Sequence, residues 1–272
     1  MPPVSRVRSS LLSVVLVGVI ALAAHVDVWL VAAAVAVVQV LVAAAPSLAD
    51  VRGRSVPTPR LVPTLTASAV ATALALFPHA IQGAAGTSDA FDAADTGSLA
   101  GVVPAIAVAV FVTGITQMMR TDGRRELTTA TAYAVSLATG AALATGWIGA
   151  AQSLASPAVV VAGAAGTAAG LLVWAIPGDR YLMGALAVVA GAAAGGVVPV
   201  VADTSVFFSI AFGIAVGSGA ALFGVLGQVL GRALISGRRH ASTGWGFPAA
   251  MSVALAAPVV FVGGQIAVSV PF

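Results

Sequence analysis

The stretch VFFSIAFGIAVGSGAALFGVLGQVLGRALI, residues 206–235, decides the fold class of this chain. Its first charged residue is Arg232, close to its end. As one helix it would measure about 45 Å at 1.5 Å per residue, longer than the roughly 30 Å hydrocarbon core of a bilayer. The stretch therefore predicts a transmembrane helix that tilts, or that projects past the bilayer at its arginine-bearing end.

Glycines recur along this stretch at helical spacing. Gly213 and Gly217 stand four residues apart, as do Gly227 and Gly231. Small residues at this spacing let helix backbones approach closely in lipid, where packing drives association. We expect a closely packed element around which the other helices are arranged; the alternative is chance, in a chain with 30 glycines. The same glycines also permit a homo-oligomer.

The composition of the whole chain gives the same fold class. Of its 272 residues, 60% are hydrophobic and 8% are charged, whereas soluble domains carry about 25% charged residues. No polar block is long enough to fold as a soluble domain, so we predict one all-α membrane domain over residues 1–272. The arginines are scattered between apolar runs, and we expect a lipid partner and no nucleic acid.

Two residue types are missing from the chain. Cysteine is absent, which excludes disulfides, thiolate nucleophiles and Cys-ligated metals. Lysine is absent too, and all twelve basic residues are arginine. Together with the heavy use of alanine, valine and glycine, this suggests a GC-rich bacterial genome. We therefore expect a multi-pass protein of the bacterial plasma (inner) membrane.

The apolar runs predict nine spans, over residues 9–24, 29–45, 61–77, 99–119, 127–148, 157–176, 181–201, 206–235 and 247–270. The first run, after Arg6 and Arg8, could also be the apolar part of a cleaved signal peptide. Because the apolar sequence resumes after His25 and Asp27, a retained hairpin of two spans is the better interpretation.

The positions of the charges test the count of nine. With the N-terminus in the cytoplasm and the C-terminus outside, all twelve arginines fall on cytoplasmic segments. Four acidic residues share that side, and five lie on the other. This is the bias that the positive-inside rule requires, and a miscounted span would have scattered the arginines.

A candidate binding site lies at the cytoplasmic end of residues 206–235. It comprises Arg232, Arg238, Arg239 and His240, with Asp179 on another cytoplasmic turn. Arginines there can anchor a helix to anionic headgroups, each worth roughly 1 kcal/mol near the surface. The alternative is a specific phosphate site that uses the bidentate guanidinium group. Anionic lipids, or a membrane-protein partner, are the expected ligands.

The last two spans resemble the end of a known enzyme family. A glycine-rich span ending in Gly227-Gln228-Val229, a basic segment and a span containing Ala256-Ala257-Pro258-Val259 are similar to the CDP-diacylglycerol synthases (phosphatidate cytidylyltransferases). The tight N-terminal hairpin, the basic linker and the nine spans are similar in layout too. The resemblance implies a polytopic helical fold and CTP-dependent transfer to a lipid phosphate.

The chain departs from this family where the chemistry should lie. Gln228 stands where the family has aspartate, and Arg232 where it has serine. The family's Lys-Asp, His-Gly-Gly and paired aspartates have no counterpart between His240 and Ala256, and only Asp179-Arg180-Tyr181 stands near its Asp-x-x-Ala-Tyr element. Nucleotidyl transfer needs carboxylates that hold a divalent cation. We therefore expect a non-enzymatic scaffold or lipid- or partner-binding protein, without metal or cofactor.

Two other functions stay open. One is a divergent CTP-dependent phospholipid nucleotidyltransferase that uses Mg²⁺ with Asp179, Arg238 and Arg239. The other is a permease or a membrane subunit of a transport complex. No charged residue lies in the middle of a span, which argues against an ion-driven carrier. The four tryptophans lie near predicted span ends, as in an aromatic belt that anchors the helices.

Overall fold

A computed structural model describes residues 3–46, 58–77, 99, 101–121, 126–201, 209–235 and 246–269. Within these ranges the chain is helical and contains no strand. The helices are α1 (Pro3–Ala24), α2 (Val28–Ala43), α3 (Leu61–Leu76), α6 (Val102–Met118), α7 (Leu127–Leu143), α8 (Gly146–Gln152), α9 (Ala158–Ala175), α10 (Arg180–Val201), α11 (Ile210–Ile235) and α12 (Gly246–Ser269).

Six segments among the described residues are long and apolar enough to cross a membrane. They are Arg6–Ala24, Leu127–Gln152, Ala158–Ala175, Arg180–Val201, Ile210–Leu234 and Gly246–Ile266. Three further apolar helices, α2, α3 and α6, have 16, 16 and 17 residues and would measure roughly 24–26 Å. The predicted all-α membrane class is confirmed, while the count of nine spans stays a prediction.

The predicted span 127–148 is divided in the structure. Helix α7 ends at Leu143, and the short helix α8 begins at Gly146. A Cβ on Gly146 would lie 2.7 Å from the carbonyl oxygen of Ala257, so the backbone of α12 lies directly against the break. The apolar segment thus continues to Gln152 as two helices, which hydropathy alone does not reveal.

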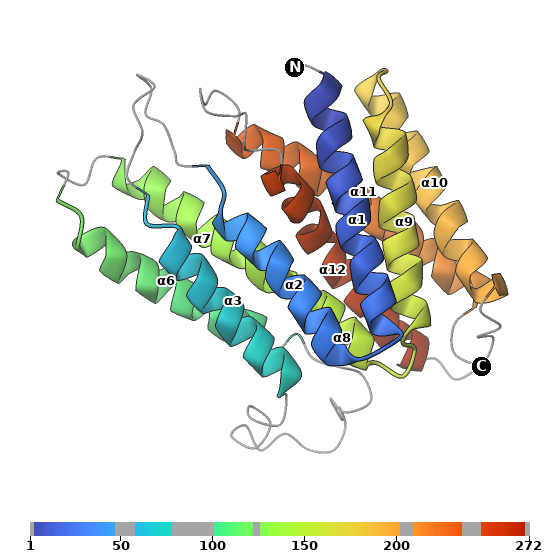
Figure 1. Ribbon diagram of the computed structural model, residues 1–272, viewed down its shortest axis with the longest axis horizontal. Coiled ribbons are helices and arrows are strands. Elements are labelled where there is room, and N and C mark those ends of the chain that lie inside the picture. Colours follow the sequence, from blue (N-terminus) through green and yellow to red (C-terminus); the bar gives the residue numbers. More distant parts are fainter. Residues whose placement is uncertain are drawn as a thin grey trace.

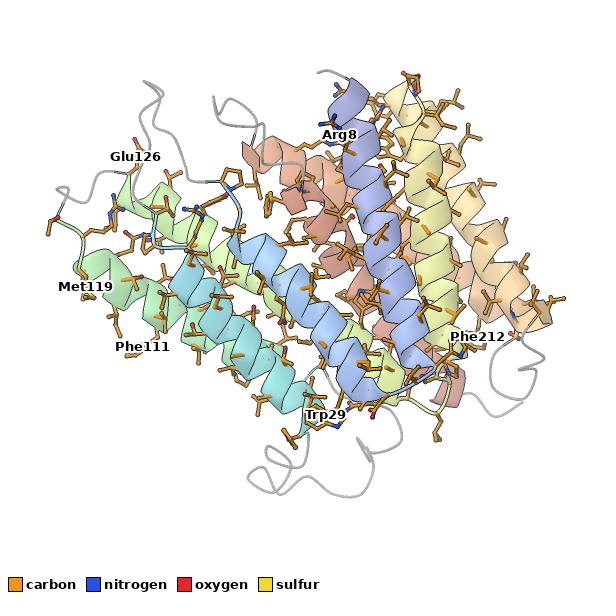
Figure 2. All side chains as sticks on the ribbon, in the orientation of Figure 1. Arg8, Trp29, Phe111, Met119, Glu126 and Phe212 are labelled. Atoms are coloured by element: carbon orange, nitrogen blue, oxygen red, sulfur yellow. The ribbon has the colours of Figure 1, made fainter. Side chains whose placement is uncertain are left out.

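Contacts between helix ends show that α1, α2 and α3 alternate in direction. The first turns of α1 and the last turns of α2 meet at the start of α12, where Leu12 and Leu41 both lie beside Gly246. At the opposite end, the ring of Trp29 packs edge-on against Phe77, with centroids 5.9 Å apart. In Figure 2, Arg8 and Glu126 lie at one end of the bundle, and Trp29 and Phe212 at the other.

The structure corrects the expectation that the other helices surround the span 206–235. Figure 1 shows two groups of helices, with α2, α3, α6 and α7 on one side and α1 and α9–α12 on the other. Helix α11 packs mainly against α9, α10 and α12, whereas α12 contacts α1, α2, α7, α8, α9 and α11. Small side chains around all faces of α12, among them Ala249, Ser252 and Ala256, let it occupy this central place.

Glycines bring α11 close to its neighbours. A Cβ at Gly213 or Gly217 would lie 2.4 or 2.3 Å from a carbonyl oxygen of α10. One at Gly227 would lie 2.5 Å from the carbonyl oxygen of Met251, and one at Gly231 would lie 2.8 Å from Cα of Pro248, both on α12. Both glycine pairs therefore sit at backbone-to-backbone contacts, the first with α10 and the second with α12.

The outer surface of the bundle is apolar. Leu22 of α1, Phe111 of α6 and Val189 of α10 are 71%, 70% and 64% exposed. Phe111 projects from the outer face of α6 in Figure 2. Side chains of this kind would be unfavourable in water, and a lipid solvent explains their exposure.

Replacement of Gly217 by alanine should destabilise the protein. The added methyl group meets the backbone of α10, and overpacking of this kind costs about 1–3 kcal/mol. Gly114→Ala is the matched control, because a Cβ there meets nothing within 4 Å. We expect a lower unfolding temperature in detergent for Gly217→Ala and an equal or slightly higher one for Gly114→Ala. Equal stability of the two variants would contradict the contact.

Candidate functional site

A row of serines on α1 forms the first part of the candidate site. Ser9 and Ser10 are neighbours, Ser13 follows one helical turn later, and all three are at most 1% exposed. The apolar residues Val15 and Val19 of the same helix are exposed instead. The polar face of α1 is therefore turned into the protein, toward α11 and α12.

Gln228 of α11 is the centre of a hydrogen-bonded network that includes these serines. Its side chain is fully buried. Its amide nitrogen donates to Ser10 Oγ at 3.2 Å and approaches Ser13 Oγ at 3.5 Å. Its amide oxygen lies 3.3 Å from Ser9 Oγ. The close contact of Gly227 with α12 holds α11 in the position from which Gln228 reaches α1.

Arg232 lies one turn beyond Gln228 and completes the network. Its Nη2 donates to the amide oxygen of Gln228 at 2.6 Å and to Ser9 Oγ at 2.7 Å. A third, longer contact of 3.4 Å joins Nη2 to the carbonyl oxygen of Arg6. Charge-assisted bonds of this length are the stronger class of hydrogen bond. They fix the guanidinium group at the end of the bundle.

Helix α12 closes the other side of the network. Ser13 Oγ lies 2.8 Å from Ser252 Oγ and 3.3 Å from the carbonyl oxygen of Ala249. Ser252 Oγ in turn donates to the same carbonyl at 2.7 Å. Polar side chains from α1, α11 and α12 are thus satisfied by one another without water, as the interior of a membrane protein requires.

Arg6 and Trp174 lie beside this network and are not satisfied in the same way. The guanidinium carbon of Arg6 lies 4.1 Å from the centroid of the Trp174 ring, a cation–π contact worth about 0.5–2 kcal/mol. Nε of Arg6 and Nε1 of Trp174 are both buried, and neither finds an acceptor among the described residues. The indole is only 5% exposed. Two buried N–H donors therefore lie close together without a partner.

Positive charge collects around these two residues. Arg6 interacts electrostatically with both Arg180 and Arg232. Asp179, beside Arg180, caps the start of α10. Its carboxylate accepts hydrogen bonds from the backbone N–H groups of Tyr181 (3.0 Å) and Leu182 (2.9 Å). Within the described ranges, no carboxylate forms an ion pair with Arg6, Arg180 or Arg232.

The structure separates the residues predicted for the site. Arg232 belongs to the network, and Asp179 caps α10 near Arg180. Arg238, Arg239 and His240 lie outside the described residues. Gly227 and Gly231 set the approach of α12, while Gly213 and Gly217 lie toward the opposite end of α11, against α10.

Sequence reasoning missed the serines of α1, and it assigned Trp174 and Trp147 to an aromatic belt. Both tryptophans are buried, at 5% and 0% exposure, so that assignment is wrong for them. The indole N–H of Trp147 donates to the carbonyl oxygen of Val253 at 2.9 Å. The spacing Ser9, Ser10, Ser13 was the signal available, because it places three hydroxyls on one face of an otherwise apolar helix.

A second buried polar group lies on the other side of the bundle. The amide nitrogen of Gln39 donates to Thr72 Oγ1 at 3.1 Å and to the carbonyl oxygen of Ala141 at 3.2 Å. These bonds join α2, α3 and α7. Since they leave the amide fully engaged and involve no charged residue, this group connects helices and offers no ligand site.

Comparisons of the chain with protein-family models, with curated proteins and with solved structures find no match. In the part of the chain that the structure describes, no three histidine, aspartate or glutamate side chains gather as a metal site would require. The candidate site is thus a cluster of arginine, glutamine, serine and tryptophan, whose chemistry is hydrogen-bond donation and positive charge.

A double-mutant cycle should reveal the strength of the network. Gln228→Leu removes the amide that donates to Ser10 and one of the acceptors of Arg232. A buried polar group left without its partner costs about 1–3 kcal/mol. Ser10→Ala should be less harmful in the Gln228→Leu background than alone, with a coupling energy of about 0.5–3 kcal/mol. Thr66→Ala, on α3, is the control partner and should add independently. Additive effects of Gln228→Leu and Ser10→Ala in unfolding measurements would exclude the network.

Proposed function

We propose that this chain is a multi-pass protein of the bacterial plasma membrane that binds anionic lipid headgroups and acts as a non-catalytic scaffold. The N-terminus and the arginine-bearing end face the cytoplasm. The observation that carries the proposal is the gathering of arginines at one end of the bundle. Arg8 lies at this end in Figure 2, and Arg232 donates to the carbonyl oxygen of Arg6, two residues before Arg8. Arg6 in turn interacts electrostatically with Arg180.

This placement of the arginines favours the binding of anionic lipids. Guanidinium groups near the cytoplasmic leaflet are attracted to its anionic headgroups, each by roughly 1 kcal/mol. With the apolar outer surface of the bundle in the hydrocarbon core, these groups would lie at headgroup depth. Asp27, at the opposite end, caps α2.

In this proposal the layout resemblance to CDP-diacylglycerol synthases reflects common ancestry, and the enzymatic activity has been lost. Gln228 and Arg232, which replace the family's aspartate and serine, hydrogen-bond to each other and so lock the position where a metal-binding carboxylate would be needed. Asp179 caps a helix. Both observations favour a scaffold over a nucleotidyltransferase.

Cysteine labelling tests the orientation, and the cysteine-free chain makes it direct. Val26 lies in the turn between α1 and α2 and is 73% exposed; Tyr181 lies at the start of α10 and is 90% exposed. In intact cells a membrane-impermeant maleimide should label Val26→Cys, and it should label Tyr181→Cys only after the membrane is opened. Labelling of both from the same side would contradict the alternation.

Lipid retention tests the binding. The protein, reconstituted with equal amounts of phosphatidylcholine and phosphatidylglycerol and then extracted, should retain phosphatidylglycerol preferentially in native mass spectra. Arg8→Gln with Arg180→Gln removes two exposed charges and should lower that preference about tenfold or more. Asp27→Asn, which keeps the helix cap at the other end, should leave it unchanged. Equal retention of both lipids by the wild-type chain would reject the proposal.

A further inference from the structure

We propose that Arg6 and Trp174 form a specific site for one phosphate group, between the beginning of α1 and the end of α9. The inference rests on the proposed function and deepens it, because it assigns a defined hydrogen-bonding site to a surface that would otherwise attract lipids only by charge. The ligand class is a phosphate group, carried by a lipid headgroup or free in solution.

The two unpartnered donors carry the inference. Trp174 Nε1 and Arg6 Nε are buried N–H groups with no acceptor among the described residues. An unmet buried donor is unfavourable by about 1–3 kcal/mol, and tryptophan and arginine have no acceptor atoms with which they could satisfy each other. A group with several acceptor oxygens can meet both donors at once, and a phosphate group is such an acceptor.

The surroundings select an anion over a neutral acceptor. Arg180 and Arg232 both lie within electrostatic range of Arg6, and no described carboxylate forms an ion pair with any of the three. Arg232 makes its three hydrogen bonds through Nη2, which leaves its Nη1 and Nε groups able to donate outward. The guanidinium group binds phosphate through such paired donors.

The orientation of the indole agrees with a ligand on the α1 side. A Cβ at Gly184 of α10 would lie 3.9 Å from Cζ3 of Trp174. Nε1 lies on the opposite edge of the ring and so points away from α10. Because Arg6 lies over the ring face at 4.1 Å, one ligand at this edge can reach both donors.

The indole N–H resonance of Trp174 provides a direct test in the full-length protein. We would record nitrogen–proton spectra of the indoles in maltoside micelles, which contain no phosphate, before and after addition of phosphatidylglycerol, and in the same micelles titrated with inorganic phosphate. The Trp174 resonance, assigned with Trp174→Phe, should move downfield as its N–H gains an acceptor. The Trp147 resonance should stay in place, because that N–H already donates to Val253.

Each arm has a defined meaning. A shift with phosphatidylglycerol alone assigns the site to a lipid phosphate, and a shift with inorganic phosphate assigns it to the free anion. Arg6→Gln should abolish the shift, whereas Arg120→Gln, which removes a charge from the same end on α6, should preserve it. A Trp174 resonance that responds to neither ligand overturns the inference.

A binding measurement separates this site from the general proposal. Trp174→Phe keeps the aromatic ring beneath Arg6 but removes the indole donor. It should lower the affinity for the phosphate ligand about tenfold, as expected for the loss of one charge-assisted hydrogen bond. If the chain prefers phosphatidylglycerol and Trp174→Phe binds it as tightly as wild type, the site is wrong and the proposed function stands. If inorganic phosphate shifts Trp174 while no anionic lipid is preferred, the site stands and the proposed function fails.

Discussion

A buried polar group in lipid must find its partner inside the protein, and this constraint organises the arginine-bearing end of the molecule. Gln228 is fully buried, and its amide can be satisfied only by groups from other helices. The serines of α1 and the guanidinium group of Arg232 supply them. Because an unsatisfied alternative is costly in a medium without water, the network fixes the register of α1 against α11 and α12.

Glycine makes that network geometrically possible. Gln228 reaches α1 only because Gly227 and Gly231 bring the backbone of α11 against residues 248–252 of α12. Ser252, on that same segment, then meets Ser13. Apolar packing between helices is weakly directional in lipid, since lipid tails are as apolar as the side chains. The close backbone approach therefore sets the distance, and the hydrogen bonds select the register.

The sequence was informative where a single physical variable decides the outcome. Hydropathy placed the helices of the described ranges, while the orientation inferred from the arginine bias stays a prediction. It was less informative about neighbours, because periodicity does not reveal which apolar face meets which: α12 rather than α11 lies between the two groups of helices. Gln228 was noticed only as a departure from a family pattern. Its role depends on serines more than 200 positions away in the chain, which no local reading could pair with it.

The contrast between Trp147 and Trp174 shows how the same residue type can serve structure in one place and offer a site in another. Both indoles are buried, yet the N–H of Trp147 is bonded to Val253 while that of Trp174 is not. The difference lies in the neighbours: Trp147 faces a carbonyl group of the central helix α12, and Trp174 faces an arginine. A donor placed against a cation gains nothing from it as a hydrogen-bond partner. An acceptor placed between the two can bond to both, and beside three arginines a negatively charged acceptor is favoured over a neutral one.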